Sequence, residues 1–175
     1  MVHTADDMNA TSLTQMSVAN LLRLYSEILA ELKQRGIVRS TNNPVADYAE
    51  YLVVKALRLQ RAPKSTKGYD AIDEKGHKYE IKGRRPTSSN ESRMLSAIRN
   101  CEAAHFDYLA GILFNEDFSF DKACVVPFAI VLAEAKYRKH VNAHIFELRD
   151  SLWGREGVLD ISDDVRRVIT SDAAQ

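Results

Sequence analysis

Two acidic residues and a lysine lie close together in this sequence, within a stretch whose pattern predicts a β-hairpin. A three-residue loop after Asp73 would put Asp70 opposite Glu80, with their Cβ atoms about 5 Å apart. Lys82 shares the face of Glu80, because side chains alternate along a strand. The hairpin therefore predicts two carboxylates and one ammonium group on a single surface.

This set of groups suits metal-dependent cleavage of a phosphodiester. Two facing carboxylates repel each other unless a cation lies between them. Mg²⁺ takes oxygen ligands and keeps several waters, so Asp70, Glu80 and the backbone carbonyl of Ile81 are candidate metal ligands. Lys82 could polarise the attacking water or stabilise the charge that develops on phosphorus. The alternative is a surface hairpin in which these residues are simply solvated.

A fourth candidate, Glu50, lies on the helix predicted before the hairpin. Asn43 can cap this helix and Pro44 suits its first position, so we expect it to run from about residue 44 to 60. At 100° per residue, Glu50 falls at the edge of the apolar arc. Its carboxylate either extends to solvent or is directed at the site on the hairpin.

The candidate site lies inside the one strongly basic segment of a neutral chain. Residues 55–99 contain twelve Lys or Arg and five Asp or Glu, a net charge of +7, so the rest of the chain carries −7. Clustered cations bind phosphates, although a solvated, charge-balanced surface is the alternative. The candidate phosphate or base contacts in this segment are Lys64, Ser65, Lys67, Arg84 and Arg85.

The predicted elements alternate between helices and strands. We expect helices over about 16–35, 44–60, 88–100 and 127–139, a hairpin over 69–84, strands over 108–114 and 118–126, and a small helix near the C-terminus. The helix at 88–100 rests on a capping box of Ser88 and Glu91. This order predicts an α/β fold with a mixed central sheet flanked by helices.

Three regions follow from these patterns. Residues 1–15 are polar and we expect a flexible tail; residues 16–42 form an N-terminal helical extension and a linker; residues 43–175 form the main domain. The apolar stripe of the first helix, which includes Val18, Leu22 and Ile28, is interpreted as core packing, with a dimer seam as the alternative.

Composition excludes several classes of protein. No apolar run reaches the length of a membrane span, and the N-terminus lacks a secretory signal. Cys101 and Cys124 have no partners at metal-site spacing and are interpreted as small buried side chains of a reduced protein. We therefore expect a cytoplasmic protein that does not enter the membrane.

The motifs Gly68-Tyr69-Asp70 and Tyr79-Glu80-Ile81-Lys82-Gly83 resemble those of the PD-(D/E)XK nuclease superfamily. The resemblance covers residues 43–126, about half of the chain, and includes the αβββαβ order of elements. Tyr69 stands where many members have proline. Glu50 occupies the place of a further glutamate that many members carry near the metal.

The resemblance implies a restriction-endonuclease-like fold and a type II restriction-endonuclease-like activity on DNA. It implies catalytic roles for Asp70, Glu80, Lys82 and Glu50, with Mg²⁺, or Mn²⁺ in its place, as cofactor. Family analogy also suggests a homodimer.

Two other functions stay open at this point. A nucleic-acid-binding module could keep the fold without cleaving, although the presence of Asp70, Glu80 and Lys82 together argues against it. An interaction protein could use the N-terminal helix, and would show no effect of Mg²⁺ or Mn²⁺ on melting.

Overall fold

The computed structural model describes residues 13–63, 66–99, 101–103 and 105–173. Most of the predicted tail at 1–15 therefore lies outside the described residues. The chain divides into two compact units, Met1–Pro44 and Val45–Gln175, and each is described here by itself.

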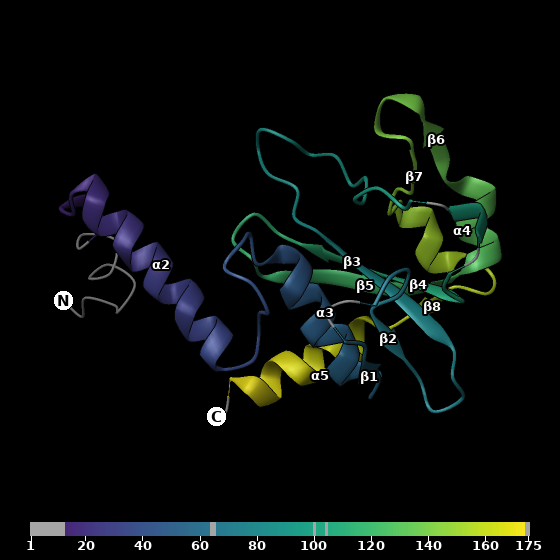
Figure 1. The fold of residues 1–175 in the computed structure, drawn as a ribbon, viewed down its shortest axis with the longest axis horizontal. Coiled ribbons are helices and arrows are strands. Elements are labelled where there is room, and N and C mark those ends of the chain that lie inside the picture. The colour runs from purple at the N-terminus through teal and green to yellow at the C-terminus, as the bar shows by residue number, and fades with distance from the viewer. Residues whose placement is uncertain (1–12, 64–65, 100, 104, 174–175) are drawn as a thin grey trace. The chain divides into compact units, whose positions relative to one another are not determined.

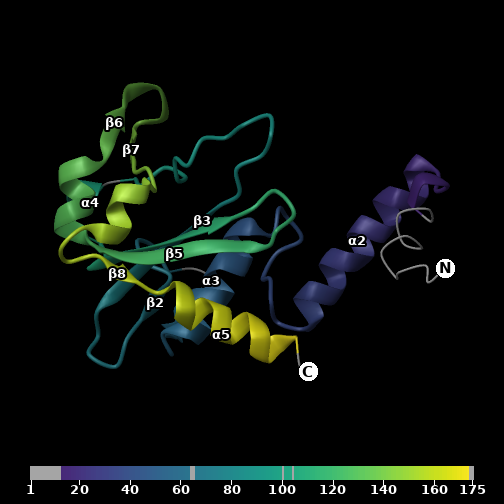
Figure 2. The ribbon, with the colours of Figure 1, turned by 180° about the vertical axis from the view of Figure 1, so that it is seen from behind.

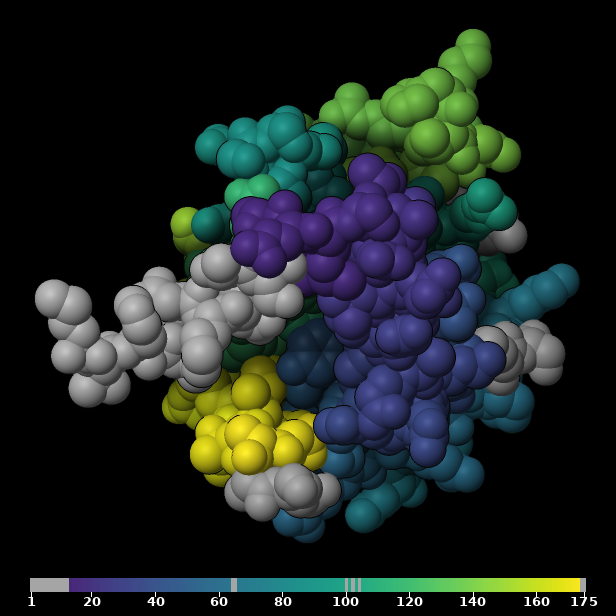
Figure 3. Space-filling model, turned by 90° about the vertical axis from the view of Figure 1, so that its left-hand side faces the viewer, coloured from purple at the N-terminus to yellow at the C-terminus, as the bar shows by residue number. Residues whose placement is uncertain are grey.

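The first unit contains the helix α2, Val18–Gln34, which confirms the predicted N-terminal helix. The Ser17 side chain caps it by accepting a hydrogen bond from the Asn20 N–H. The interpretation of its apolar stripe as core packing is wrong. Val18 is 74% exposed and Leu22 65% exposed, and only Leu29 of this helix is buried. The helix is coloured purple to blue in Figure 3. Periodicity identifies an apolar face, but it does not identify what covers that face.

The second unit is built around a six-stranded mixed sheet with the order β1-β2-β3-β4-β5-β8 (Figure 1). β3 and β4 are parallel, and the other neighbouring strands are antiparallel. The strands are β1 Gln60–Arg61, β2 Ala71–Ile72, β3 Lys78–Arg84, β4 Tyr108–Phe114, β5 Phe120–Pro127 and β8 Leu159–Asp160. The prediction of an α/β fold with a mixed central sheet is confirmed.

Helices and turns cover both faces of this sheet (Figure 2). The helices α3, Val45–Ala56, and α5, Ser162–Asp172, pack on one face. The helix α4, Phe128–Glu134, and the 3₁₀ turn Asp150–Gly154 pack on the other. Each face has its own apolar core. No helix in the described part of the chain has both the length and the apolar character needed to cross a lipid bilayer.

Close packing at Gly83 brings α3 against β3. A Cβ atom at Gly83 would lie 2.8 Å from the Ala49 Cβ and 2.8 Å from the Val45 carbonyl oxygen. Only glycine leaves room for this approach. The helix that carries Glu50 is therefore held directly over the strand that carries Glu80.

β4 confirms the prediction of a central strand, since residues 109–114 are all buried. Cys101 and Cys124 are buried as well, as predicted. The helix predicted at 127–139 is shorter than expected. It ends at Glu134, and the polar residues that follow form β6, Lys136–Arg138, which pairs with β7, Ala143–Ile145.

The prediction of a helix at 88–100 is wrong. Ser88 donates its N–H and hydroxyl to the Glu116 carboxylate, so it does not form a capping box with Glu91. The backbones of Leu95 and Ile98 pair with the chain at 144–146. Pairing with a distant segment therefore overrides the local capping signal, and residues 88–99 are extended and irregular.

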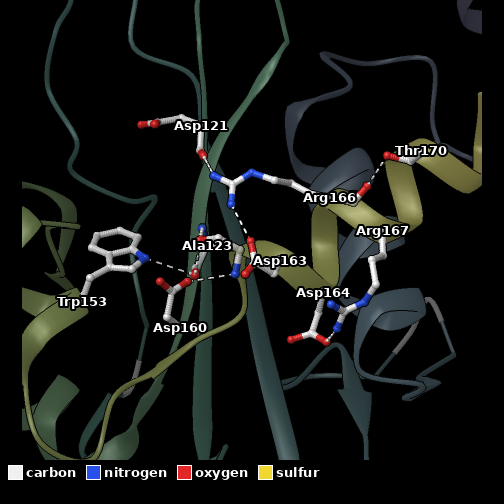
Figure 4. Close-up of polar contacts among 10 residues, drawn as sticks. Asp121, Ala123, Trp153, Asp160, Asp163, Asp164, Arg166, Arg167 and Thr170 are labelled. Carbon is white, nitrogen blue, oxygen red and sulfur yellow. Dashed lines mark hydrogen bonds and ion pairs between the residues drawn. The ribbon is translucent and has the colours of Figure 1, made fainter.

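Polar contacts at Ala123 anchor α5 to the sheet (Figure 4). The Ser162 hydroxyl, which is buried, donates to the Ala123 carbonyl oxygen and accepts the Ala123 N–H. Trp153 donates its indole N–H to the same carbonyl oxygen. Arg166 joins the Asp163 carboxylate to the Asp121 carbonyl oxygen. The Ser162 and Arg166 bonds tie α5 to β5, and the Trp153 bond ties the 3₁₀ turn Asp150–Gly154 to the same strand.

Candidate active site

The register of the β2–β3 hairpin is the one that the sequence predicts. Ala71 pairs with Tyr79 and Ile72 pairs with Lys78. The Asp73 N–H donates to the His77 carbonyl oxygen across the turn. This register puts Asp70 beside Glu80, at the end of the β2–β3 ladder.

Asp70 lies directly before the residues of β2 that pair with β3. Its carboxylate accepts the Ile81 N–H of β3, which a backbone carbonyl would accept if the pairing continued. Its N–H donates to the Tyr79 carbonyl oxygen at 2.8 Å, and its Oδ2 accepts the Ile81 N–H at 2.7 Å. Gly68, two residues earlier, has φ of +92°, and a Cβ there would lie 2.6 Å from the His105 Cβ. The glycine allows the sharp entry that points the Asp70 carboxylate at β3.

Glu80 and Lys82 lie on one face of β3, as predicted, and form an ion pair. The Lys82 Nζ is 2.8 Å from the Glu80 Oε1, and the two side chains are 11% and 18% exposed. Ile81, between them, is buried in the core on the α3 side of the sheet. The hairpin thus separates its functional candidates from its core residue.

Glu50 faces inward from α3 and is held by Arg61, a residue that the sequence analysis missed. The Arg61 Nε lies 2.8 Å from the Glu50 Oε1, and the side chains are 22% and 12% exposed. Arg61 is in β1, opposite Ala71 and next to the residue whose N–H bonds to the Asp70 carbonyl oxygen. Glu50 is therefore paired with a cation at the edge of the site and does not extend freely into solvent.

The electrostatics show that these groups form one cluster. Burial, and then the negative charge of Glu80, raise the pKa of Asp70 from 3.8 to about 6. The Ile81 N–H lowers it, Glu50 raises it further and Lys82 lowers it. Asp70 is the member whose charge the protein compensates least.

The oxygens available to a cation here are those of Asp70 and Glu80, with the Ile81 carbonyl on the strand between Glu80 and Lys82. No group of three or more Asp, Glu, His or Cys side chains gathers at one potential metal position in the described parts of the chain. A cation at this place would keep water molecules as its other ligands, which is usual for Mg²⁺.

The residues predicted to contact phosphates differ in their exposure and in the hydrogen bonds that they already form. Lys67 is exposed. Arg84 donates its Nε to the Ser92 carbonyl oxygen at 2.6 Å, and Arg85 donates to the Glu116 carbonyl oxygen. The first bond ties Arg84 to the irregular segment that follows β3, and the second ties Arg85 to the turn between β4 and β5, so both arginines have structural contacts. Lys64 and Ser65 lie outside the described residues.

Two comparisons with known proteins returned nothing: no protein-family model matches the chain, and a search of curated proteins found no relative.

Proposed function

We propose that this protein is a Mg²⁺-dependent endonuclease that hydrolyses DNA phosphodiester bonds, with a restriction-endonuclease-like core. The observation that carries the proposal is the placement of Asp70 beside Glu80 and Lys82, with Asp70 at the point where two strands separate. Three charged groups at the end of one hairpin, all partly buried, are more than a surface turn requires.

The order of elements supports the same core. A helix, α3, precedes a hairpin, β2–β3, which is followed by a strand, β4, parallel to β3. This is the αβββαβ order with one difference, since an irregular segment replaces the helix before β4. That segment still makes the crossover that a parallel pair needs.

The donor set fits a hard divalent cation. Its protein ligands would be carboxylates and a carbonyl, which are oxygens of the kind that Mg²⁺ and Mn²⁺ bind. Burial, and after it the negative charge of Glu80, raise the pKa of Asp70, so the protein compensates the ionised carboxylate only in part. A bound cation would supply that compensation and would stabilise the charge on the phosphoryl group and the leaving oxygen.

The chain's own residues supply positioning and charge. Lys82, held at 2.8 Å from Glu80, presents an ammonium group that can orient a water or stabilise the negative charge developing on phosphorus. The Ile81 N–H fixes the Asp70 carboxylate. Glu50, paired with Arg61, is a third carboxylate near enough to raise the pKa of Asp70, after Glu80.

The test is incubation of the purified chain with plasmid DNA and Mg²⁺ or Mn²⁺, with a structured RNA as comparison substrate. We expect metal-dependent cleavage of DNA, lost on addition of EDTA and in Glu80→Gln. The matched control is Glu147→Gln, which changes a half-buried glutamate that pairs with Arg149 away from the hairpin, and it should cleave normally. Equal cleavage by Glu80→Gln and wild type would contradict the proposal. Absence of any metal effect on cleavage or melting would favour an interaction protein that uses α2.

A further inference from the structure

A second basic surface lies outside the segment 55–99. β6 and β7 form a hairpin, residues 136–145, in which Tyr137 pairs with His144 and Arg138 pairs with Ala143. Residues 136–141 are all exposed, and the hairpin projects away from the central sheet (Figure 1). We call residues 136–145 the basic hairpin.

The basic hairpin is rich in positively charged side chains. The run Lys136-Tyr137-Arg138-Lys139-His140 carries three permanent cations and no acid. Within the described residues, these three cations form no ion pair. By contrast, Arg149, Arg155 and Arg167 each lie against a carboxylate. A surface that only keeps a protein in solution normally mixes both signs of charge.

An exposed aromatic ring accompanies the cations. Tyr137 is 54% exposed, and its hydroxyl donates to the Asn142 side-chain oxygen at 2.8 Å. Its ring lies 5.4 Å from the ring of His144. Asn142 has φ of +47°, so the turn that presents this face is tight. Cations beside an aromatic ring match a sugar–phosphate backbone, which combines anionic oxygens with apolar surface.

The basic hairpin lies on the same side of the sheet as Glu80 and Lys82. Glu80 pairs with Leu109, whose side chain belongs to the core opposite α3. The basic hairpin joins that side, because His144 exchanges backbone hydrogen bonds with Ile98, a member of the same core. The active hairpin and the basic hairpin therefore both belong to the side of the central sheet opposite α3.

We propose that the basic hairpin binds the sugar–phosphate backbone of a DNA duplex whose scissile phosphate lies at Lys82. This rests on the proposed function, and it adds a contact about sixty residues away from the active hairpin in sequence. Charge complementarity favours a polyanion as the partner, because three exposed cations share one projecting hairpin and have no ion-pair partner in the described part of the chain.

The experiment compares two triple variants of the full chain that change net charge equally. The first is K136Q, R138Q and K139Q. The control is R149Q, R155Q and R167Q, whose arginines are already paired with carboxylates. Affinity for a short DNA duplex is measured by fluorescence anisotropy in EDTA over a series of NaCl concentrations. We expect the hairpin variant to lower the slope of log K against log salt by about 2 to 3 units, because each lost phosphate contact removes about 0.9. The control should keep the wild-type slope within about half a unit.

Melting curves of both variants check that the fold is intact. We expect the melting temperature of the hairpin variant to match that of wild type, because the substituted side chains are exposed. Equal slopes for the two variants would overturn the proposal. So would a hairpin variant that loses binding to vesicles of anionic phospholipid while its DNA slope stays that of wild type. Wild-type protein that binds DNA through the hairpin but does not cleave it with Mg²⁺ would overturn the proposed function and leave the hairpin contact standing.

Discussion

Two clusters of charged side chains in this protein shift the pKa of an aspartate in opposite directions. Asp150 is an exposed residue that accepts from Arg93 at 2.7 Å and also from Lys122. Its pKa is lowered, first by the hydrogen bond from Lys122 and then by Arg93. Asp70 is largely buried, and its pKa is raised to about 6 by burial and by Glu80.

The two clusters differ in how many cations pair with each carboxylate. At the surface, two cations serve one acid. At the hairpin, the nearby cations are already paired with other acids, Lys82 with Glu80 and Arg61 with Glu50. Among the described residues, the Asp70 carboxylate accepts one hydrogen bond, from the Ile81 N–H, and Lys82 lowers its pKa only as the last of the causes. An acid that folding has left short of positive charge marks the place where an external cation gains most.

The largest effect that separates the two clusters should be on catalysis. Asp70→Asn should lower the rate of Mg²⁺-dependent DNA cleavage by at least about a thousandfold, because it removes a negative ligand from the cation position. Asp150→Asn should stay within about twofold of wild type. Single-turnover rates at saturating Mg²⁺ measure both. A similar loss in the two variants would show that the clusters do not differ in function.

The next effect concerns ion pairs. Arg61→Met should lower the free energy of unfolding by about 3 kcal/mol, because it leaves the largely buried Glu50 carboxylate without its cation. Arg93→Met should change stability little, since its partner Asp150 is exposed and keeps Lys122. Urea denaturation in EDTA measures both. Equal losses would mean that the Arg61 pair is effectively solvated.

The hairpin register could be predicted because it depends on local chemistry. Gly76 has φ of +82° and closes the loop, and Asp73 accepts from the Lys75 and His77 N–H groups, so the turn itself fixes which residues face each other. The placement of Asp70, Glu80 and Lys82 follows from that register by simple alternation.

The missed features depend on contacts that are distant in sequence. Arg61 belongs to a strand of two residues, too short for any periodic signal, and it meets Glu50 only because the chain reverses at Arg58, with φ of +54°. The extended segment at 88–99 pairs with residues 144–148 about fifty positions later. Local patterns carry no information about such partners.

A smaller effect tests the raised pKa of Asp70 in the absence of metal. An acid whose pKa is higher in the folded state than in the unfolded state destabilises the fold once it ionises. Ionisation of Asp70 therefore lowers the free energy of unfolding as pH rises from about 4 to 6. Asp70→Asn keeps an oxygen for the Ile81 N–H and removes the charge. It should therefore raise the free energy of unfolding by about 2 kcal/mol at pH 7 and leave it nearly unchanged at pH 4. Lower stability of Asp70→Asn at pH 7 would mean that the carboxylate is a structural element.

The smallest effect uses salt to separate the same two aspartates. Asp150 is exposed and has a lowered pKa, so its contribution to stability is present at neutral pH and is lost as pH falls through its folded pKa. Asp150→Asn should lower the melting temperature slightly at low ionic strength and not at all near 1 M NaCl, where the Debye length is about 3 Å. The gain from Asp70→Asn should persist at high salt, because desolvation is its first cause and salt does not screen burial. If both effects vanished together in salt, Asp70 would be an ordinary surface acid, and the charge deficit that supports a cation at the hairpin would disappear with it.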